Sequence, residues 1–310
     1  MNRHQYNLPS KDGINKIHCV HWQAEKPVAL LQIVHGMTEF IERYDDFARF
    51  LCSHNISVVG HDHLGHGETA KTSDDFGFFH TKYGAEYLVE DTYTVTKNIK
   101  ETYPETPIFI LGHSMGSFCT RMYLTKHADL FSGAIIMGTG HPAKLLTNFA
   151  TKGIGLYIRL KGERYRSQLI SKFVFFQYMK GISKPKTSVD WISRDEEMTK
   201  KYLATPFCTF TFTLRAYEDL FRMIHHCIYE IDLEQIPKDM PILITSGGCD
   251  PVGDWGKSPN KVYQSYLKHG LQNVELKLYP EDRHEILNEL DRDVVYADLL
   301  QWILNHLQQC

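Results

Sequence analysis

Residues Ile108–Ser117 read IFILGHSMGS, and they carry the strongest indication of the fold. The stretch begins with a short apolar run, Ile108–Leu111, which is typical of a strand buried on both faces. A G-x-S-x-G pattern centred on Ser114 follows at once, and a stretch of helical character follows the pattern. A strand that turns sharply into a helix requires glycine on both sides of the serine, because a Cβ atom there would collide with the neighbouring elements. The segment therefore predicts a tight turn that lifts the Ser114 hydroxyl clear of a sheet.

Short apolar runs of the same kind recur along the chain and alternate with longer stretches of helical period. This alternation is typical of the α/β fold class, in which a mostly parallel sheet is joined by crossover helices. The expected strands are His18–Trp22, Val28–His35, Ile56–Asp62, Ile108–Gly112, Ala134–Gly138, Ile242–Ser246 and Val274–Tyr279. Apolar residues at helical spacing predict crossover helices around residues 47–54, 88–103 and 295–303.

The alternation breaks between about Gly140 and Pro237, where the pattern is helical with few signs of strands. Residues 140–237 are therefore interpreted as a helical insertion, and residues 1–139 and 238–310 as one α/β core. From Lys144 to Lys186 the insertion carries ten Lys or Arg residues and a single acid, Glu163, among many apolar side chains. Two hypotheses fit this pattern: the cations form the solvent face of a lid, or they face an anionic membrane or micelle surface.

The composition excludes several classes of protein. With 310 residues, 43% of them apolar, and a formal net charge of −3, the chain is neither disordered nor fibrous, and nucleic-acid binding is not expected. Its seven cysteines include no C-x-x-C pair, so we expect reduced thiols rather than zinc or redox chemistry. The first residues lack the apolar run of a signal peptide, and no stretch is long and apolar enough to cross a bilayer. A cytoplasmic location is expected.

A serine hydroxyl is a poor nucleophile near neutral pH, so Ser114 needs a histidine base and an acid that orients it. After a strand-turn-helix motif of this kind the expected chain order is serine, acid, histidine. Asp250 follows the strand expected at 242–246, and His284 follows the one at 274–279. The carboxyl ends of parallel strands meet at one edge of the sheet, so these two side chains should lie near Ser114.

Asp254 and Asp282 compete for the role of the acid. Asp250 is favoured because it lies closest to its strand end and precedes the rigid Pro251. Two backbone N–H groups should bind the oxyanion of the tetrahedral intermediate. One belongs to Met115, directly after the serine, and the natural candidate for the other is Met37, in the loop after the strand at 28–34.

Taken together, these motifs resemble those of α/β-hydrolases of the monoacylglycerol lipase, lysophospholipase and serine aminopeptidase type. The resemblance rests on His35–Glu39 with Arg43 and Tyr44, Asp62–Gly67, Gly112–Gly116, Gly248–Pro251 and His284–Glu289. It implies a helical cap, formed by residues 140–237, over the site. It also implies that the His61, Asp62, His63 and His66 group is a structural loop rather than a metal site. Leu64 departs from the pattern, because such proteins often carry Arg there.

We therefore expect a serine hydrolase without cofactor or metal that cleaves esters with an apolar acyl chain through an acyl-enzyme. Monoacylglycerols, lysophospholipids and simple esters all fit as small-molecule substrates. Six phenylalanines of the insertion either line the acyl pocket or pack the core of the insertion itself: Phe173, Phe175, Phe176, Phe207, Phe210 and Phe212. One alternative is an aminopeptidase, whose substrate ammonium group would be held by Glu163, Glu218 or Asp219. Another is a non-catalytic lipid-binding module on the same scaffold.

Overall fold

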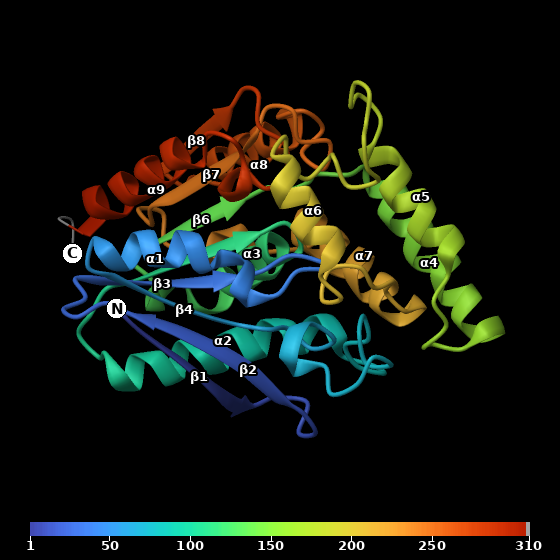
Figure 1. The fold of residues 1–310 in the computed structure, drawn as a ribbon, viewed down its shortest axis with the longest axis horizontal. Coiled ribbons are helices and arrows are strands. Elements are labelled where there is room, and N and C mark those ends of the chain that lie inside the picture. The colour runs from blue at the N-terminus through green and yellow to red at the C-terminus, as the bar shows by residue number, and fades with distance from the viewer. Residues whose placement is uncertain (308–310) are drawn as a thin grey trace.

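The computed structural model describes residues 1–307, and its centre is an eight-stranded, mostly parallel sheet flanked by helices (Figure 1). The strands lie in the order β1-β2-β4-β3-β5-β6-β7-β8, in which β1 and β2 are antiparallel to their neighbours and the others are parallel. Their bounds are β1 Asn2–Pro9, β2 Lys16–Gln23, β3 Ala29–Val34, β4 Ile56–His61, β5 Ile108–His113, β6 Gly133–Met137, β7 Ile242–Gly247 and β8 Val274–Tyr279. The seven expected strands are confirmed, with ends shifted by one or two residues.

The eighth strand, β1, is absent from the sequence prediction. Its residues NRHQYNLP are mostly polar and exposed, and only Tyr6 and Leu8 pack against the apolar core. β1 forms because it pairs antiparallel along the whole length of β2, from Asn2 opposite Gln23 to Pro9 opposite Lys16. Two apolar side chains are too few to mark a strand in the sequence, so the pairing with β2 reveals it only in the structure.

The central strands are buried on both faces, and successive side chains enter two separate cores. In β5, Ile108 and Ile110 join one apolar cluster, and Phe109 and Leu111 join the other. Helices α2 and α3 and part of α8 contribute to the first cluster, whereas α1 and α9 contribute to the second. These helices are α1 Asp45–Ser53, α2 Gly84–Thr102, α3 Met115–His127, α8 Lys257–Lys268 and α9 Arg292–Leu307. The crossover helices expected around residues 47–54, 88–103 and 295–303 are confirmed.

Four further helices lie between β6 and β7, and this stretch contains no strand. They are α4 Lys144–Lys161, α5 Gln168–Tyr178, α6 Glu196–Ala204 and α7 Leu214–Tyr229, and together they are called the α4–α7 segment below. The segment lies beyond the carboxyl ends of the parallel strands, with α4 packed on α7 (Figure 1). Short 3-10 helices occur at Ile41–Tyr44, Gly67–Thr69, Ala128–Leu130, Leu233–Gln235 and Ile286–Asn288. Within residues 1–307, none of the helices is both long enough and apolar enough to span a membrane.

Candidate active site

Ser114 lies in the turn between β5 and α3, with φ 52° and ψ −118°. A non-glycine residue rarely adopts a positive φ, so this backbone is strained and must be held in place by its surroundings. The surroundings are tight: a Cβ at Gly116 would lie 2.0 Å from the carbonyl oxygen of Val34, and one at Gly112 would lie 2.3 Å from Thr120 Oγ1. The sharp turn and the need for both glycines, as expected from the sequence, are confirmed.

Asp250 and His284 meet at the carboxyl ends of β7 and β8. The His284 Nδ1 atom lies 3.0 Å from Asp250 Oδ2, and both side chains are buried. Asp250 also accepts hydrogen bonds from the Ser246 hydroxyl and, at 2.8 Å, from the backbone N–H of Val252. These contacts hold the carboxylate in one orientation, facing the imidazole.

The two competing acids have other partners. Asp254 forms an ion pair with Lys257 at 3.9 Å, and Asp282 bonds to Arg194 at 2.5 Å. Among the residues that the structure describes, neither of them bonds to His284. Of the three candidate acids, the structure therefore brings Asp250 to the imidazole.

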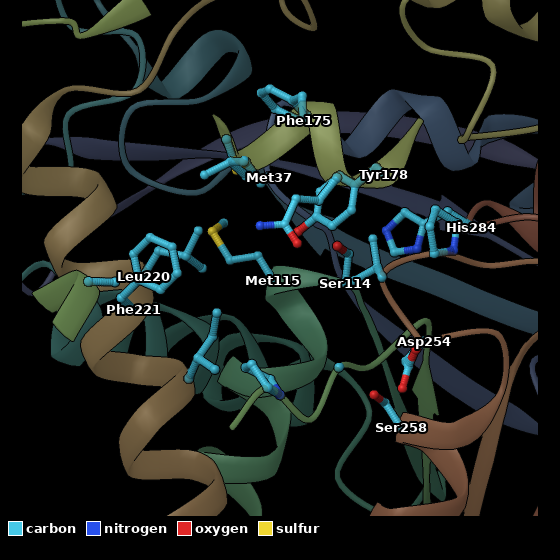
Figure 2. A pocket seen from close by; sticks show the side chains of 18 of the residues that line it. Met37, Ser114, Met115, Phe175, Tyr178, Leu220, Phe221, Asp254, Ser258 and His284 are labelled. Carbon is cyan, nitrogen blue, oxygen red and sulfur yellow. The ribbon is translucent and has the colours of Figure 1, made fainter. Parts of the chain in front are cut away.

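Ser114 and His284 both line one cavity of about 910 Å³ (Figure 2). Within residues 1–307 the Ser114 hydroxyl has no hydrogen-bond partner, so it is open to a ligand in the cavity. Figure 2 shows Leu220 and Phe221 on one side of Ser114, with His284, Asp254 and Ser258 on the other. The cavity thus has an apolar side and a side that carries polar groups.

Met37 and Met115 line the same cavity. Met115 is the first residue of α3, where backbone N–H groups have no acceptor within the helix. Met37 follows Gly36, which packs against the serine so closely that a Cβ on it would lie 2.9 Å from Ser114 Cβ. Both expected oxyanion donors therefore lie on elements adjacent to the serine.

A buried ion pair that the sequence reasoning did not assign lies behind the serine. His113 Nδ1 lies 2.8 Å from Glu39 Oε1, and the hydroxyl of Tyr44 donates to Glu39 Oε2 at 2.7 Å. Burial alone would lower the pKa of His113, but the carboxylate of Glu39 outweighs it and raises the pKa to about 9. Burial likewise opposes ionisation of Glu39, yet the charge of His113 holds its pKa well below the usual range. The two side chains are thus a charged pair at neutral pH.

A second buried pair, Arg43 with Glu285, lies beside the first. Asn288 also donates to Glu285, at 2.8 Å. Because Glu285 directly follows His284 in the chain, this pair ties the histidine loop to the loop after β3. The only sequence signal for these residues was their place in the motifs that carry the family resemblance.

The backbone of residues 190–195 runs along the loop that carries His284. The N–H of Glu285 donates to the carbonyl of Ile192 at 2.8 Å, and that of His284 donates to the carbonyl of Trp191 at 3.4 Å. The Trp191 ring lies 5.2 Å from the His284 ring, centroid to centroid. Trp191 could not be recognised from the sequence, because no local pattern connects it to a residue more than ninety positions away.

The histidine-rich loop after β4 holds neighbouring backbone in place. Burial lowers the pKa of His66 to about 3, so its ring is neutral, and its Nε2 accepts a hydrogen bond from the N–H of Thr38 at 3.3 Å. Asp62 accepts one from the N–H of Ile41 at 2.7 Å and bonds to His18. Leu64, which departs from the family pattern, is buried in the apolar core. These contacts shape the loop that carries Met37.

The six phenylalanines differ in where they lie. Phe173 and Phe175 line the cavity, but Phe176 is exposed and Phe212 is buried in the core. Phe207 and Phe210 pack against other aromatic rings instead. Side chains of α4, α5 and α7 supply most of the apolar wall: Leu146, Phe149, Ile154, Leu169, Ile170, Val174, Leu220, Phe221 and Ile224.

The three acids considered for an aminopeptidase lie outside the cavity lining. Glu163 and Glu218 both pair with Arg215, and Asp219 pairs with Arg222 at 3.1 Å. Burial raises the pKa of Asp219 to about 7, so this carboxyl is only partly ionised at neutral pH. None of the three is placed to bind the ammonium group of a substrate at Ser114.

The sheet order, the strained serine turn and the Asp250–His284 pair define an α/β-hydrolase. The model of the family described as serine aminopeptidase, S33, matches residues 25–291, and the chain belongs to this family.

Two similar proteins match nearly the whole chain, and a third matches less than half of it. The chain is 28% identical over 304 residues to the monoglyceride lipase homolog of Monkeypox virus, covering 94% of this chain and 95% of that one. It is 32% identical to the Mus musculus monoglyceride lipase over 135 residues, which are 42% of this chain and 41% of the mouse protein. The crystal structure of a thermostable carboxyl esterase from Bacillus coagulans superimposes with a TM-score of 0.89 at 29% identity, covering 99% of both chains.

Proposed function

We propose that this protein is a serine hydrolase that cleaves carboxylic esters with an apolar acyl chain, in the manner of a monoacylglycerol lipase. The observation that carries the proposal is that Ser114 and His284 line the same cavity as a long apolar surface formed by α4, α5 and α7. The names of the similar proteins, lipases and an esterase, point to the same reaction.

In the proposed reaction the Ser114 hydroxyl attacks the ester carbonyl while His284 takes its proton. Asp250 fixes the tautomer of His284 and stabilises the imidazolium that forms. The N–H groups of Met37 and Met115 bind the oxyanion, and His284 returns the proton to the leaving alcohol. A water molecule then gives a proton to His284 and attacks the acyl carbonyl. The bond to the serine oxygen breaks, His284 returns the proton to that oxygen, and the fatty acid leaves.

The cavity supports a substrate with a long acyl chain. An apolar wall contributes about 25 cal/mol for each Å² of chain removed from water, so a longer chain is bound more tightly until the wall ends. The polar groups on the His284 side, Asp254 and Ser258, can hydrogen-bond a hydroxylated leaving group such as glycerol. Monoacylglycerols, lysophospholipids and simple esters all meet this description.

We further propose that residues 140–237 act as a cap that docks on anionic lipid surfaces. Support comes from the exposed apolar side chains Leu160, Leu169 and Phe176, which lie on α4 and α5 among exposed lysines. Such a surface inserts apolar groups between lipids while its cations contact headgroups. A cytoplasmic location is proposed on the ground that the six described cysteines are all free thiols.

Labelling with a fluorophosphonate probe tests the reaction class. The wild type should be labelled and should hydrolyse p-nitrophenyl acyl esters, whereas Ser114→Ala should lose both properties. Ser258→Ala, a second serine of the same cavity, is the matched control and should stay labelled. An unlabelled wild type would favour the non-catalytic lipid-binding module. Preference for aminoacyl nitroanilides over acyl esters would favour the aminopeptidase.

A further inference from the structure

We propose that Tyr202, on helix α6, is a positioning residue for the oxyanion site: its hydroxyl holds Thr38, and Thr38 holds the backbone beside the Met37 N–H group. This inference rests on the proposed ester hydrolysis, in which the Met37 N–H binds the oxyanion. Tyr202 lies 164 positions after Thr38 in the chain, and its hydroxyl oxygen lies 2.7 Å from Thr38 Oγ1. Both side chains are buried, and both residues line the cavity of Ser114. One helix of the α4–α7 segment thus contacts the loop after β3.

Thr38 has a backbone conformation that needs such support. Its φ of 54° lies in the left-handed region, where a β-branched residue is a rare outlier. A conformation of this kind persists only where the surroundings hold it. Here the Thr38 N–H donates to His66 Nε2 at 3.3 Å, and the Thr38 hydroxyl donates to the carbonyl of Met37 at 2.7 Å. The peptide group between Met37 and Thr38 is therefore bound at both its oxygen and its N–H.

The direction of the Tyr202 hydrogen bond follows from the number of protons. A hydroxyl group donates one hydrogen bond and can accept two. Because the Thr38 hydroxyl donates to the Met37 carbonyl, it accepts from Tyr202. In the reverse arrangement the Tyr202 proton would have no acceptor within residues 1–307, which is costly for a buried hydroxyl. The Tyr202 bond therefore fixes the rotamer of Thr38 and keeps its hydroxyl on the Met37 carbonyl.

The peptide group on the other side of Met37 is held as well. His35 Nε2 accepts a hydrogen bond from the N–H of His63 at 3.0 Å, so the proton of this ring is on Nδ1, which donates to the carbonyl of Gly36 at 2.8 Å. In a trans peptide the N–H points opposite to the carbonyl, so the Met37 N–H points away from the His35 ring. This N–H has no hydrogen-bond partner within residues 1–307 and is free to bind a ligand.

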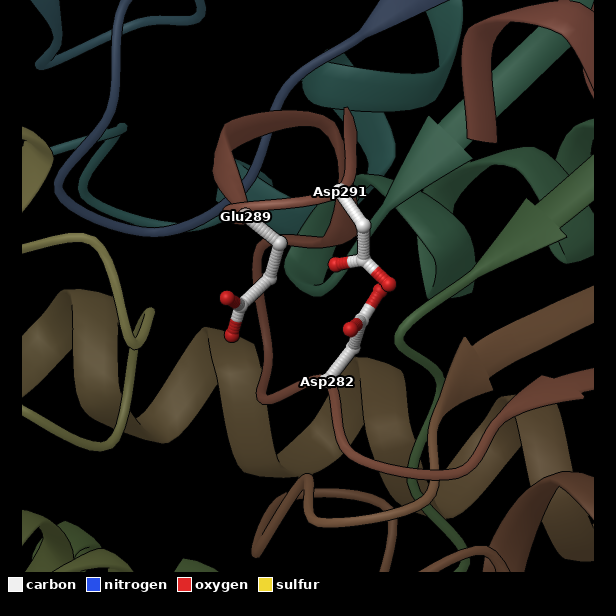
Figure 3. Close-up of side chains that lie close together, drawn as sticks. All are labelled: Asp282, Glu289 and Asp291. Atoms are coloured by element: carbon white, nitrogen blue, oxygen red, sulfur yellow. The ribbon is translucent and has the colours of Figure 1, made fainter. Parts of the chain in front are cut away.

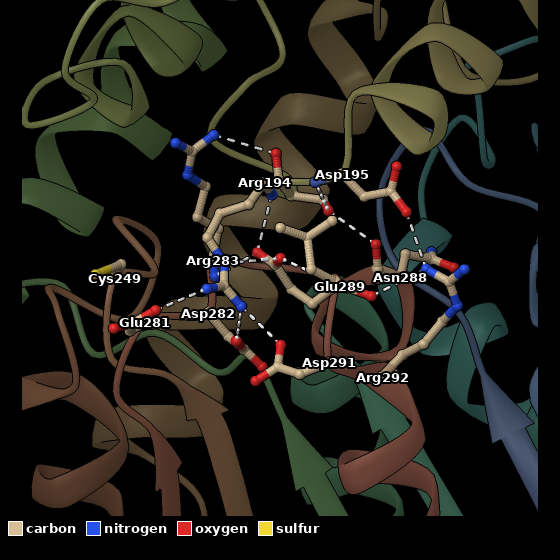
Figure 4. Close-up of polar contacts among 12 residues, drawn as sticks. Arg194, Asp195, Cys249, Glu281, Asp282, Arg283, Asn288, Glu289, Asp291 and Arg292 are labelled. Atoms are coloured by element: carbon tan, nitrogen blue, oxygen red, sulfur yellow. Dashed lines mark hydrogen bonds and ion pairs between the residues drawn. The ribbon is translucent and has the colours of Figure 1, made fainter.

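Contacts elsewhere keep α6 in place without the Tyr202 hydroxyl. Asp195, at the start of the helix, pairs with Arg292 at 2.9 Å (Figure 4). Arg194 pairs with carboxylates that lie close together in the loop after β8 (Figure 3), among them Asp282, Glu289 and Asp291. The Tyr202 ring also lies 5.0 Å from the guanidinium of Arg43. Replacement of Tyr202 by Phe keeps the ring and these contacts, so it removes only the hydrogen bond to Thr38.

Steady-state hydrolysis of p-nitrophenyl acyl esters by Tyr202→Phe tests the proposal. Misplacement of one oxyanion donor should lower kcat by about tenfold to a hundredfold and leave KM within about twofold, because the oxyanion forms only in the transition state. Tyr229→Phe is the matched control. Its hydroxyl donates to the carbonyl of Pro142 at 2.6 Å, outside the loop after β3, so kcat should stay within about twofold of the wild type. Both variants should melt close to the wild type.

Variants of Thr38 show whether Tyr202 acts through it. Thr38→Ser keeps the hydroxyl and should keep kcat within about threefold, whereas Thr38→Val removes the hydroxyl and should lower kcat at least as much as Tyr202→Phe does. A double variant with Thr38→Val and Tyr202→Phe should be no slower than Thr38→Val alone, because Tyr202 then has no hydroxyl to hold.

Three results would overturn the proposal. The first is an unchanged kcat in Tyr202→Phe. The second is a raised KM at unchanged kcat, which would mean that Tyr202 binds the substrate directly. The third is a double variant in which the two fold reductions multiply, which would mean that Tyr202 and Thr38 act separately. A wild type that neither hydrolyses esters nor reacts with the fluorophosphonate probe would instead refute the proposed function, and this inference with it.

Discussion

Arg194 and Glu289 lie 95 positions apart in the chain and are joined by two hydrogen bonds of 3.0 Å each. The backbone N–H of Arg194 donates to Oε1 and its Nε donates to Oε2, while Glu289 is fully buried. Together with the bond from the N–H of Glu285 to the carbonyl of Ile192, these contacts hold residues 190–195 against the loop of His284. The position of the imidazole thus depends on a stretch that precedes α6.

Arg194→Ala should lower the free energy of unfolding by about 3 kcal/mol, because it leaves the buried charge of Glu289 without its side-chain partner. Urea denaturation measures the change. Arg164→Ala is the control: Arg164 is 51% exposed and pairs with Asp75 at 3.5 Å, so its loss should cost less than about 1 kcal/mol. Equal losses in the two variants would show that the Glu289 contact contributes no more than an ordinary surface pair.

The Glu39–His113 pair predicts that stability falls in alkaline solution. The pKa of His113 is about 9 in the folded chain, against about 6.5 for a free histidine, so the folded state holds the proton more strongly. The stabilisation is complete below pH 6.5 and is lost as the pH rises through 9. Its loss should amount to about 1–3 kcal/mol.

Unfolding of the wild type and of His113→Gln, followed from pH 6 to 10, measures this contribution. Other groups titrate in both proteins, so the relevant quantity is the difference between their free energies of unfolding at each pH. This difference should shrink as the pH rises through 9. A difference that stays constant would mean that His113 is not charged in the folded protein.

Gly116→Ala should prevent stable folding or remove activity, since the new Cβ would lie 2.0 Å from the carbonyl oxygen of Val34, a backbone atom that cannot move alone. Gly153→Ala should instead stabilise the folded protein. Apart from its chain neighbours and the backbone of α4 itself, no described atom lies within 4 Å of a Cβ at Gly153, so alanine at this helical position should add up to about 1 kcal/mol of stability. Thermal melting of the two purified variants distinguishes them. A stable, active Gly116→Ala protein would contradict the close packing of the serine turn.

Replacement of Lys144, Lys152, Lys161 and Lys172 by Gln should weaken binding to anionic vesicles by at least about tenfold, because each cation near such a surface contributes about 1 kcal/mol. All four are exposed on α4 and α5. Vesicle co-sedimentation at low salt measures binding. A variant with Gln at Lys11, Lys16, Lys97 and Lys268, four exposed lysines outside the α4–α7 segment, removes the same charge and should bind almost normally. If both variants lose binding equally, net charge rather than this surface attracts the vesicles.

The parallel strands and the turn at Ser114 could be predicted from the sequence, because both follow from a local pattern. A strand buried on both faces must be apolar throughout, and a strained turn packed between two elements must carry glycine on each side of the serine. The same logic placed Asp250 and His284 at one edge, since residues that follow parallel strands emerge together.

The groups around that edge could not be predicted, because they meet through contacts between distant parts of the chain. β1 was not predicted because its residues are polar and it exists through pairing with β2. The Glu39–His113 pair, the contact of Trp191 with His284 and the carboxylates around Arg194 join positions that lie far apart in the chain. Charged and polar side chains find such partners through space, and their spacing in sequence carries no period that marks the contact. The apolar residues of a buried strand or helix recur at a regular spacing that can be recognised in the sequence. The pairing of one charged side chain with another has no such spacing and forms only when the chain folds.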